Sequence, residues 1–228
     1  MKVLFLSSFL LAAAGIQAQF ASISDKDGYV NIRSSASLSN NVQDTLNNGR
    51  LVYLYEKQGS FYNTEYYKRG ENRNGYVYWD RVKKVDANER VRLTSSPANT
   101  EIFSAANVKV TITRQAFVKS KYKLSYYKDA PDQIEKFNGK TGYGRDGGLP
   151  ALEYKSIQVQ VGQQVITLPA GATENLFEPS PGNTEVFYDR AKDILYIQAS
   201  NGSGAGYYDV IWKIEKGVYK ERFVVVGE

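Results

Sequence analysis

Short runs in which apolar and polar residues alternate dominate the first third of the chain. Within residues 29–33, Val30 and Ile32 alternate with more polar side chains, and this is the period of a strand with one buried face. An Asp-Gly turn precedes the run and a Ser-rich loop follows it. Similar runs between Gly and Asn turns predict further strands over 21–24, 42–46, 51–55, 61–67 and 75–79. Short strands at this spacing predict a small β-barrel.

The strand pattern returns after a polar segment, residues 87–105, which we interpret as a linker. Alternating residues over 108–118 and 122–126 predict two strands, and a later run has Tyr208, Val210, Trp212 and Ile214 on one face. No window shows a helical period. We therefore expect residues 106–228 to form an antiparallel β-sandwich or barrel of unrecognised type.

The first 18 residues differ from the rest of the chain. A basic start, Met1-Lys2, leads into an apolar stretch and then into small residues around Ala18. This pattern is typical of a secretory signal peptide over residues 1–18, and it is short for a membrane span. We expect cleavage near Ala18 and a periplasmic or secreted protein. We expect no later membrane span.

Composition excludes several kinds of chemistry. The chain contains no Cys and no His, so catalytic triads that use these residues and His- or Cys-ligated metal sites are excluded. The net charge of +5 is spread over both halves, which does not favour nucleic-acid binding. The 18 tyrosines suit half-exposed strands and binding faces.

Five short motifs in the first 86 residues occur in the order found in a known family. The chain resembles the bacterial SH3-like (SH3b) domains over residues 20–86, at Gly28-Tyr29-Val30-Asn31-Ile32-Arg33-Ser34, Leu46 with Asn48-Gly49, Val52–Tyr55, Phe61-Tyr62, and Gly75-Tyr76-Val77 with Arg81-Val82. It departs from the family at Ser35-Ala36-Ser37, where many members carry Gly-Pro. The expected fold is thus all-β: a small SH3-like barrel, then the second β-domain.

The resemblance implies a binding module, commonly for peptidoglycan peptides and usually attached to a cell-wall hydrolase or receptor. Because the chain has no Cys and no His, we expect this protein to be non-catalytic, with no cofactor or metal. The expected partner is a cell-wall peptide or an exported protein segment. The residue types permit an aromatic groove with added polar groups. Its candidate residues are Asn31, Arg33, Tyr62, Tyr66, Tyr76, Tyr78 and Trp79. Strand alternation places Tyr76 and Tyr78 on one face and Trp79 on the other, so they cannot all line one groove.

Two alternatives remain open. The protein could be an inhibitor or immunity-type protein that blocks an exported enzyme. It could also be a glycan hydrolase, because two carboxylates suffice for that reaction, and the candidates are Glu153, Glu178, Asp146, Asp189 and Asp209. A separate possibility is a binding face for anionic groups on one strand, made by Lys119, Lys121 and Lys123.

Overall fold

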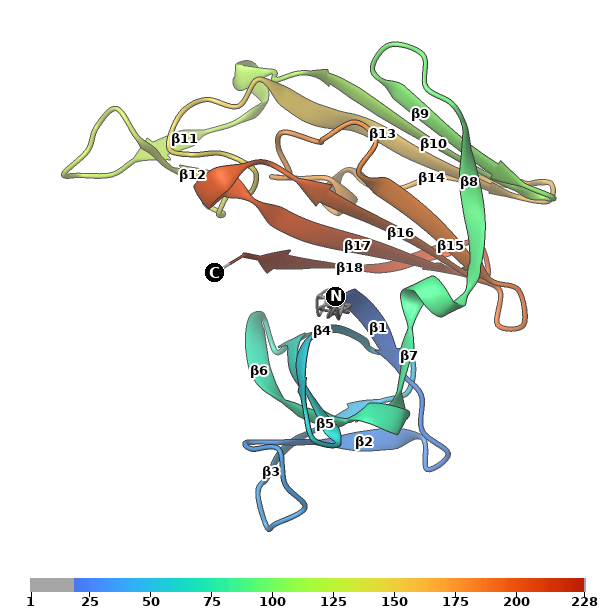
Figure 1. Cartoon of the computed structure of the whole chain (residues 1–228). Helices are drawn as coiled ribbons and strands as arrows, with labels where there is room; N and C mark the ends of the chain where they lie inside the picture. The colour runs from blue at the N-terminus through green and yellow to red at the C-terminus, as the bar shows by residue number, and fades with distance from the viewer. Residues whose placement is uncertain (1–18, 228) are drawn as a thin grey trace, which may run out of the picture.

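The computed structural model describes residues 19–227, and the predicted signal peptide lies outside the described residues. Two antiparallel β-units are stacked on each other (Figure 1), and together they form a half-barrel and a nearly closed barrel. No α-helix occurs between residues 19 and 227. The prediction of an all-β fold is confirmed.

The N-terminal sheet has seven strands in the order β3-β2-β6-β5-β4-β1-β7. Their bounds are β1 Gln19–Ile23, β2 Tyr29–Arg33, β3 Val42–Asn47, β4 Leu51–Gln58, β5 Phe61–Lys68, β6 Glu71–Tyr78 and β7 Val82–Lys84. Short 3-10 turns, η1 (Trp79–Arg81) and η2 (Val85–Ala87), flank β7. The Asp-Gly turn before β2 forms as predicted, because Gly28 adopts a φ of +85° that glycine tolerates.

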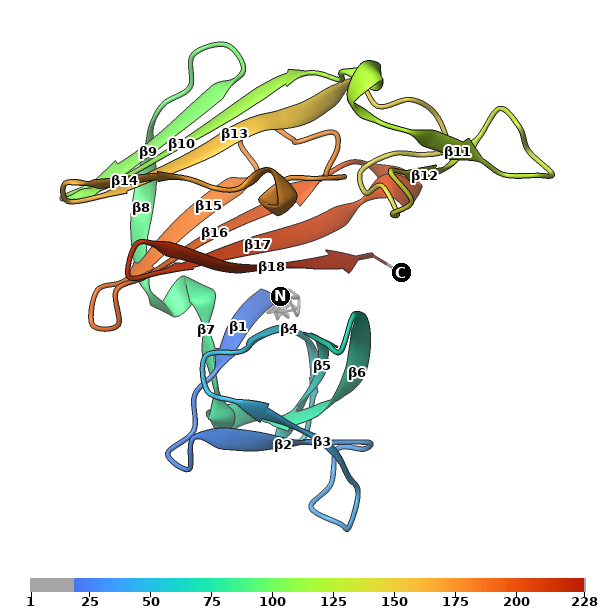
Figure 2. The same ribbon diagram turned by 180° about the vertical axis from the view of Figure 1, so that it is seen from behind.

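The C-terminal sheet has nine strands in the order β14-β13-β10-β9-β8-β15-β16-β17-β18. Their bounds are β8 Glu89–Ser95, β9 Thr100–Ala105, β10 Val108–Ala116, β13 Leu152–Val161, β14 Gln164–Thr167, β15 Thr184–Asp189, β16 Ile194–Asn201, β17 Tyr208–Glu215 and β18 Val218–Val226. A separate hairpin, β11 (Leu124–Tyr126) and β12 (Ile134–Phe137), projects from one end of this unit (Figure 2). Three 3-10 turns complete it: η3 Lys119–Lys121, η4 Ala170–Ala172 and η5 Gly204–Gly206.

The segment that we interpreted as a linker, residues 87–105, is part of the C-terminal sheet. It forms β8 and β9, and β8 pairs with both β9 and β15. In β8 only Val91 is buried, between the charged residues Arg90 and Arg92. A strand with a single buried side chain has too weak an alternation to distinguish it from a polar loop.

Strands β15, β16 and β17 are buried on both faces. In β17, Val210, Trp212 and Ile214 point into the core of the C-terminal unit. The residues between them face the N-terminal sheet: Ile211 packs in an apolar cluster, and the Lys213 ammonium donates to the Gly49 carbonyl at 2.9 Å. Because side chains alternate along a strand, each of these strands contributes to two layers at once.

The two sheets meet through an apolar interface and are joined by polar contacts around it. Phe20 on β1 packs edge-on against Phe223 on β18, with ring centroids 6.0 Å apart. The remaining buried members of this interface cluster are Leu51, Tyr53, Val85, Phe187, Ile194, Tyr196, Ile211 and Val225. Polar contacts across the same boundary include Lys83–Asp189 at 2.8 Å and Arg50–Glu221 at 3.4 Å. The stacking therefore buries apolar side chains from both units.

We expect Phe223→Ala to lower the free energy of unfolding by about 3–5 kcal/mol, because it leaves a cavity in this interface. Phe223 is 2% exposed, whereas Val218 on the same strand is 51% exposed. Val218→Ala is therefore the matched control, with an expected change within about 0.5 kcal/mol. Urea denaturation of both variants measures the difference. Equal losses would show that the interface does not contribute to stability.

Candidate functional site

A cleft of about 1070 Å³ lies between the two sheets, at one side of their apolar interface. Both units line it. The N-terminal sheet and the turn after it contribute Gln19, Phe20, Tyr53, Tyr55, Lys57, Tyr62, Lys84 and Asp86, and the C-terminal sheet contributes Arg90, Asn183, Glu185, Phe187, Gln198, Ala199, Ser200, Tyr207 and Asp209. Aromatic rings combined with a few polar groups are typical of ligand sites.

Asp209 on β17 is the most buried charged residue of this cleft, with 8% of its surface exposed. Its Oδ2 accepts a hydrogen bond from the Tyr53 hydroxyl at 2.5 Å. Its Oδ1 accepts hydrogen bonds from Ser200 at 2.5 Å and from Tyr207 at 2.8 Å. Since Tyr53 belongs to β4 and Asp209 to β17, this hydrogen bond connects the two sheets beside the cleft.

Burial and the neighbouring carboxylate keep these tyrosines in their neutral, donating form. Burial, and then the hydrogen bond to Asp209 and its charge, raise the pKa of Tyr53 well above its usual range. Burial also raises the pKa of Tyr207. Tyr55 lies edge-on to Tyr53 at 5.2 Å, and its hydroxyl donates to Glu65 at 2.6 Å. The three hydroxyls are therefore fixed on carboxylates, and the rings of Tyr53 and Tyr55 lie against each other.

Opposite charges line the outer part of the cleft. Arg90 forms an ion pair with Glu185 at 2.9 Å, and Gln198 donates to the same carboxylate at 3.0 Å. The Lys84 ammonium lies 5.8 Å from the centre of the Tyr62 ring, close enough for a cation–π contact. This part of the cleft thus offers both donors and acceptors to a ligand.

Of the seven groove residues predicted from the sequence, Tyr62 lines this cleft. The structure distributes the others elsewhere. Tyr78 packs edge-on against Phe61 at 5.2 Å. Trp79 lies in η1 rather than on a strand, is 48% exposed, and has the Lys57 ammonium 4.8 Å from its ring centre.

Asn31 and Arg33 lie on β2, and both views place β2 on the side of the N-terminal sheet away from β15–β17 (Figures 1 and 2). Arg33 donates to the Ser39 carbonyl and to the Asn41 side chain, each at 2.9 Å. These hydrogen bonds hold the Ser-rich loop that follows β2. Tyr76, half-buried on β6, is paired with Arg33 in the ladder.

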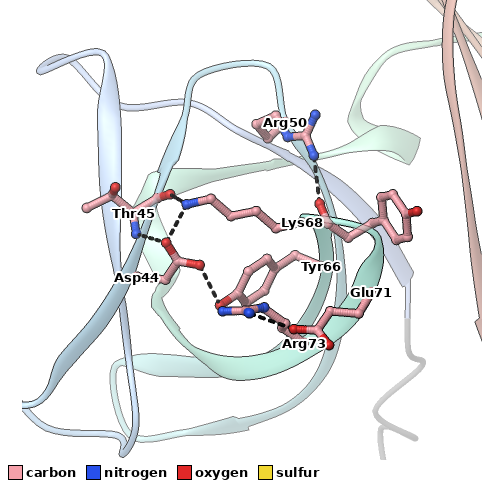
Figure 3. Close-up of polar contacts among 8 residues, drawn as sticks. Asp44, Thr45, Arg50, Tyr66, Lys68, Glu71 and Arg73 are labelled. Atoms are coloured by element: carbon pink, nitrogen blue, oxygen red, sulfur yellow. Dashed lines mark hydrogen bonds and ion pairs between the residues drawn. The ribbon is translucent and has the colours of Figure 1, made fainter.

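Tyr66 belongs to the core of the N-terminal sheet and is 1% exposed. Its hydroxyl donates to Asp44 at 3.2 Å (Figure 3), and burial together with the Asp44 charge raises the pKa of Tyr66 to about 12. Asp44 also accepts from the Lys68 ammonium and from the Thr45 backbone at 2.7 Å. This network links β3 to β5, so Tyr66 has a structural role there.

The carboxylates that we considered for glycan hydrolysis do not all gather at one site of the C-terminal unit. Glu153 is buried and accepts hydrogen bonds from Gln115, Lys121 and Tyr122. Asp189 pairs with Lys83, and Asp209 holds the hydroxyls described above. Glu178 and Asp146 both line a second, small pocket of about 180 Å³.

The three lysines proposed as one strand face do not lie on one strand. Lys119 and Lys121 are in the turn η3, and Lys123 precedes β11. The Lys121 ammonium forms an ion pair with the buried Glu153 at 2.8 Å. The alternation was misleading because the chain forms the turn η3 after β10, and alternation over so few residues does not distinguish a turn from a strand.

Residues 19–227 contain no cluster of three or more acidic side chains placed to hold a metal ion. No helix in the same range is long and apolar enough to cross a membrane.

Comparisons with protein-family models, with curated proteins and with solved structures found no match to this chain. The cleft is therefore interpreted from its own residues.

The sequence contained a signal for the cleft residues that the predicted groove omitted. Residues 194–197, Ile-Leu-Tyr-Ile, are apolar on both faces of the strand, and residues 208–214 carry Ile211 between Asp209 and Lys213 on the face opposite Val210 and Trp212. Such a two-sided pattern indicates a second layer against the outer face of the sheet. The position of Tyr53 opposite Asp209, 156 residues away in the sequence, depends on how the two units stack.

We expect Asp189→Asn to lower the free energy of unfolding by about 1–2 kcal/mol at neutral pH. Burial alone would raise the pKa of Asp189, but its hydrogen bond to Lys83 and the charge of Lys83 lower it below the usual 3.8. The pair therefore stabilises the fold above pH 3.8, and this contribution is lost as the pH falls through the lowered pKa. Wild type and variant should converge in acid.

Urea denaturation at a series of pH values between about 7 and 2 measures this convergence. Asp132→Asn changes an exposed carboxylate and serves as the control, with an expected effect within about 0.5 kcal/mol at each pH. A deficit in Asp189→Asn that stays constant down to the lowest pH would contradict the ion-pair explanation.

Proposed function

We propose that this protein is an exported, non-catalytic binding protein that holds a cell-wall peptide in the cleft between its two sheets. The observation that carries the proposal is the cleft itself, about 1070 Å³ in volume and lined by Tyr53, Tyr55, Tyr62 and Tyr207. This volume is at the upper end of the usual range of about 300–1,000 Å³ for small-molecule sites. Tyrosine offers an apolar ring and a hydroxyl, which suits a ligand with alternating polar and apolar parts.

The sequence supports the cell wall as the source of the ligand. The resemblance of residues 20–86 to SH3b domains favours a peptidoglycan peptide, and the signal-like first 18 residues favour export. In this proposal the SH3-like module contributes only one wall of the site, mainly through β1, β4, β5 and β7. The C-terminal sheet contributes the other wall, which explains why its outer face carries polar residues beside the apolar interface.

The groups in the cleft support binding rather than catalysis. The chain contains no Cys and no His. Of the two carboxylates that the C-terminal sheet places in the cleft, Glu185 is engaged by Arg90 and Gln198, and Asp209 by three hydroxyls. Such groups position a ligand by hydrogen bonds and charge.

We expect the protein to sediment with purified, insoluble peptidoglycan, and Tyr62→Ala and Tyr207→Ala each to weaken this binding about tenfold. The reason is that removing a ring from a ligand contact costs about 1–2 kcal/mol. Tyr126→Ala is the control, since Tyr126 is 44% exposed on the projecting hairpin and lies outside the cleft. Failure of the wild-type protein to sediment would overturn the proposal. Unchanged binding by both cleft variants would place the ligand elsewhere.

We also expect the chain expressed with its leader in a bacterial host to appear in the periplasm or medium and to begin at Gln19. The motif around Ala18 predicts this cleavage. Intact mass and N-terminal sequencing of the purified protein measure it. A cytoplasmic protein that retains Met1 would contradict export, and Ala18→Leu, which enlarges the small residue before the cut, should block cleavage.

A further inference from the structure

Asp209 has room for one more hydrogen bond in the cleft. A carboxylate offers about four lone-pair positions, and the hydroxyls of Tyr53, Ser200 and Tyr207 occupy three. Two of these donate to Oδ1 and one to Oδ2, so the open position is on Oδ2. Asp209 also lines the cleft, so a ligand bound there would lie next to this carboxylate.

Asp209 also lacks a positive partner. In the part of the chain from residue 19 to 227, no Lys or Arg forms an ion pair with it, and its three hydrogen-bond donors are neutral hydroxyls. The basic side chains that line the cleft have other partners. Arg90 forms its ion pair with Glu185, and the ammonium groups of Lys84 and Lys57 lie over the rings of Tyr62 and Trp79. Carboxylates with so little exposure are ordinarily paired with a cation.

Two tyrosine rings approach this carboxylate, each through its hydroxyl. Tyr53 and Tyr207 both hold it through their hydroxyls, so their rings lie beside it, and Tyr55 lies edge-on to Tyr53. The faces of aromatic rings attract cations, and rings combined with an acceptor are the usual recognition pattern for ammonium groups.

We propose that Asp209 binds a primary ammonium group of the ligand, so that the cleft selects peptides with a free amine. This inference rests on the proposed function and specifies the ligand's chemistry. The ammonium would donate to Oδ2 of Asp209 and pack against the rings of Tyr53 and Tyr207. A charge-assisted hydrogen bond at a buried site is stronger than a neutral one, and it would supply the missing counter-charge.

The test compares two forms of one probe: soluble peptidoglycan fragments with their free amines intact, and the same fragments after acetylation of those amines. Acetylation removes the positive charge and leaves the glycan and the peptide backbone unchanged. We expect calorimetric titration of the wild-type protein to show about tenfold tighter binding of the unmodified fragments, as the loss of one charge-assisted hydrogen bond predicts.

Two variants then assign the effect to Asp209. Asp209→Asn keeps an oxygen acceptor for the hydroxyls but removes the charge, and it should bind both forms of the probe equally. Asp132→Asn is the control, because it neutralises an exposed carboxylate that does not line the cleft, and it should keep the tenfold preference. Thermal unfolding of both variants shows whether they fold like the wild type.

The outcomes separate this inference from the function on which it rests. Equal binding of both forms by the wild-type protein overturns the ammonium site and leaves the peptide-binding proposal standing. No binding of either form overturns both. A preference for the free amine that survives in a folded Asp209→Asn protein overturns the role of Asp209. If Asp209→Asn does not fold, the binding of the two probe forms by the wild-type protein still tests the ammonium site.

Discussion

Burial of β15, β16 and β17 on both faces is the constraint on which the rest of this structure depends. One face of each strand fills the core of the C-terminal unit, and the other packs against β1 and β4. The second face is apolar at Phe187, Tyr196 and Ile211. Leaving these side chains in water would cost about 1.5–3 kcal/mol each, so the two sheets are held together as one body. The polar contacts across the boundary then fix their relative position.

The cleft is a consequence of where that apolar contact ends. Along β16, apolar Ile194 and Tyr196 face the N-terminal sheet, and polar Gln198 and Ser200 follow on the same face. Two curved sheets that pack at one side diverge at the other, and polar residues line the part that diverges. A ligand bound there would contact both units and would stabilise their arrangement in proportion to its affinity.

The tyrosines connect the architecture to the proposed function. Rings such as Tyr53 and Tyr196 bury apolar area at the interface, while the hydroxyls of Tyr53, Tyr55 and Tyr207 are held on carboxylates. A fixed ring has little conformational freedom left to lose when a ligand binds. In the proposed function, the tyrosines therefore have two roles: they stabilise the interface between the sheets, and they contact the ligand in the cleft.

The sequence by itself determined the fold class and most strand positions, because strand alternation and Gly/Asn turns are local properties. β2, for example, was predicted at Tyr29–Arg33 and occurs there. It did not determine β8, whose one buried residue leaves almost no pattern, or the turn η3, from which Lys121 reaches Glu153. Only the tertiary structure decided the site. Tyr62 was identified from its motif, whereas Tyr53 and Asp209 meet because two sheets distant in sequence stack face to face, and no local pattern encodes that register.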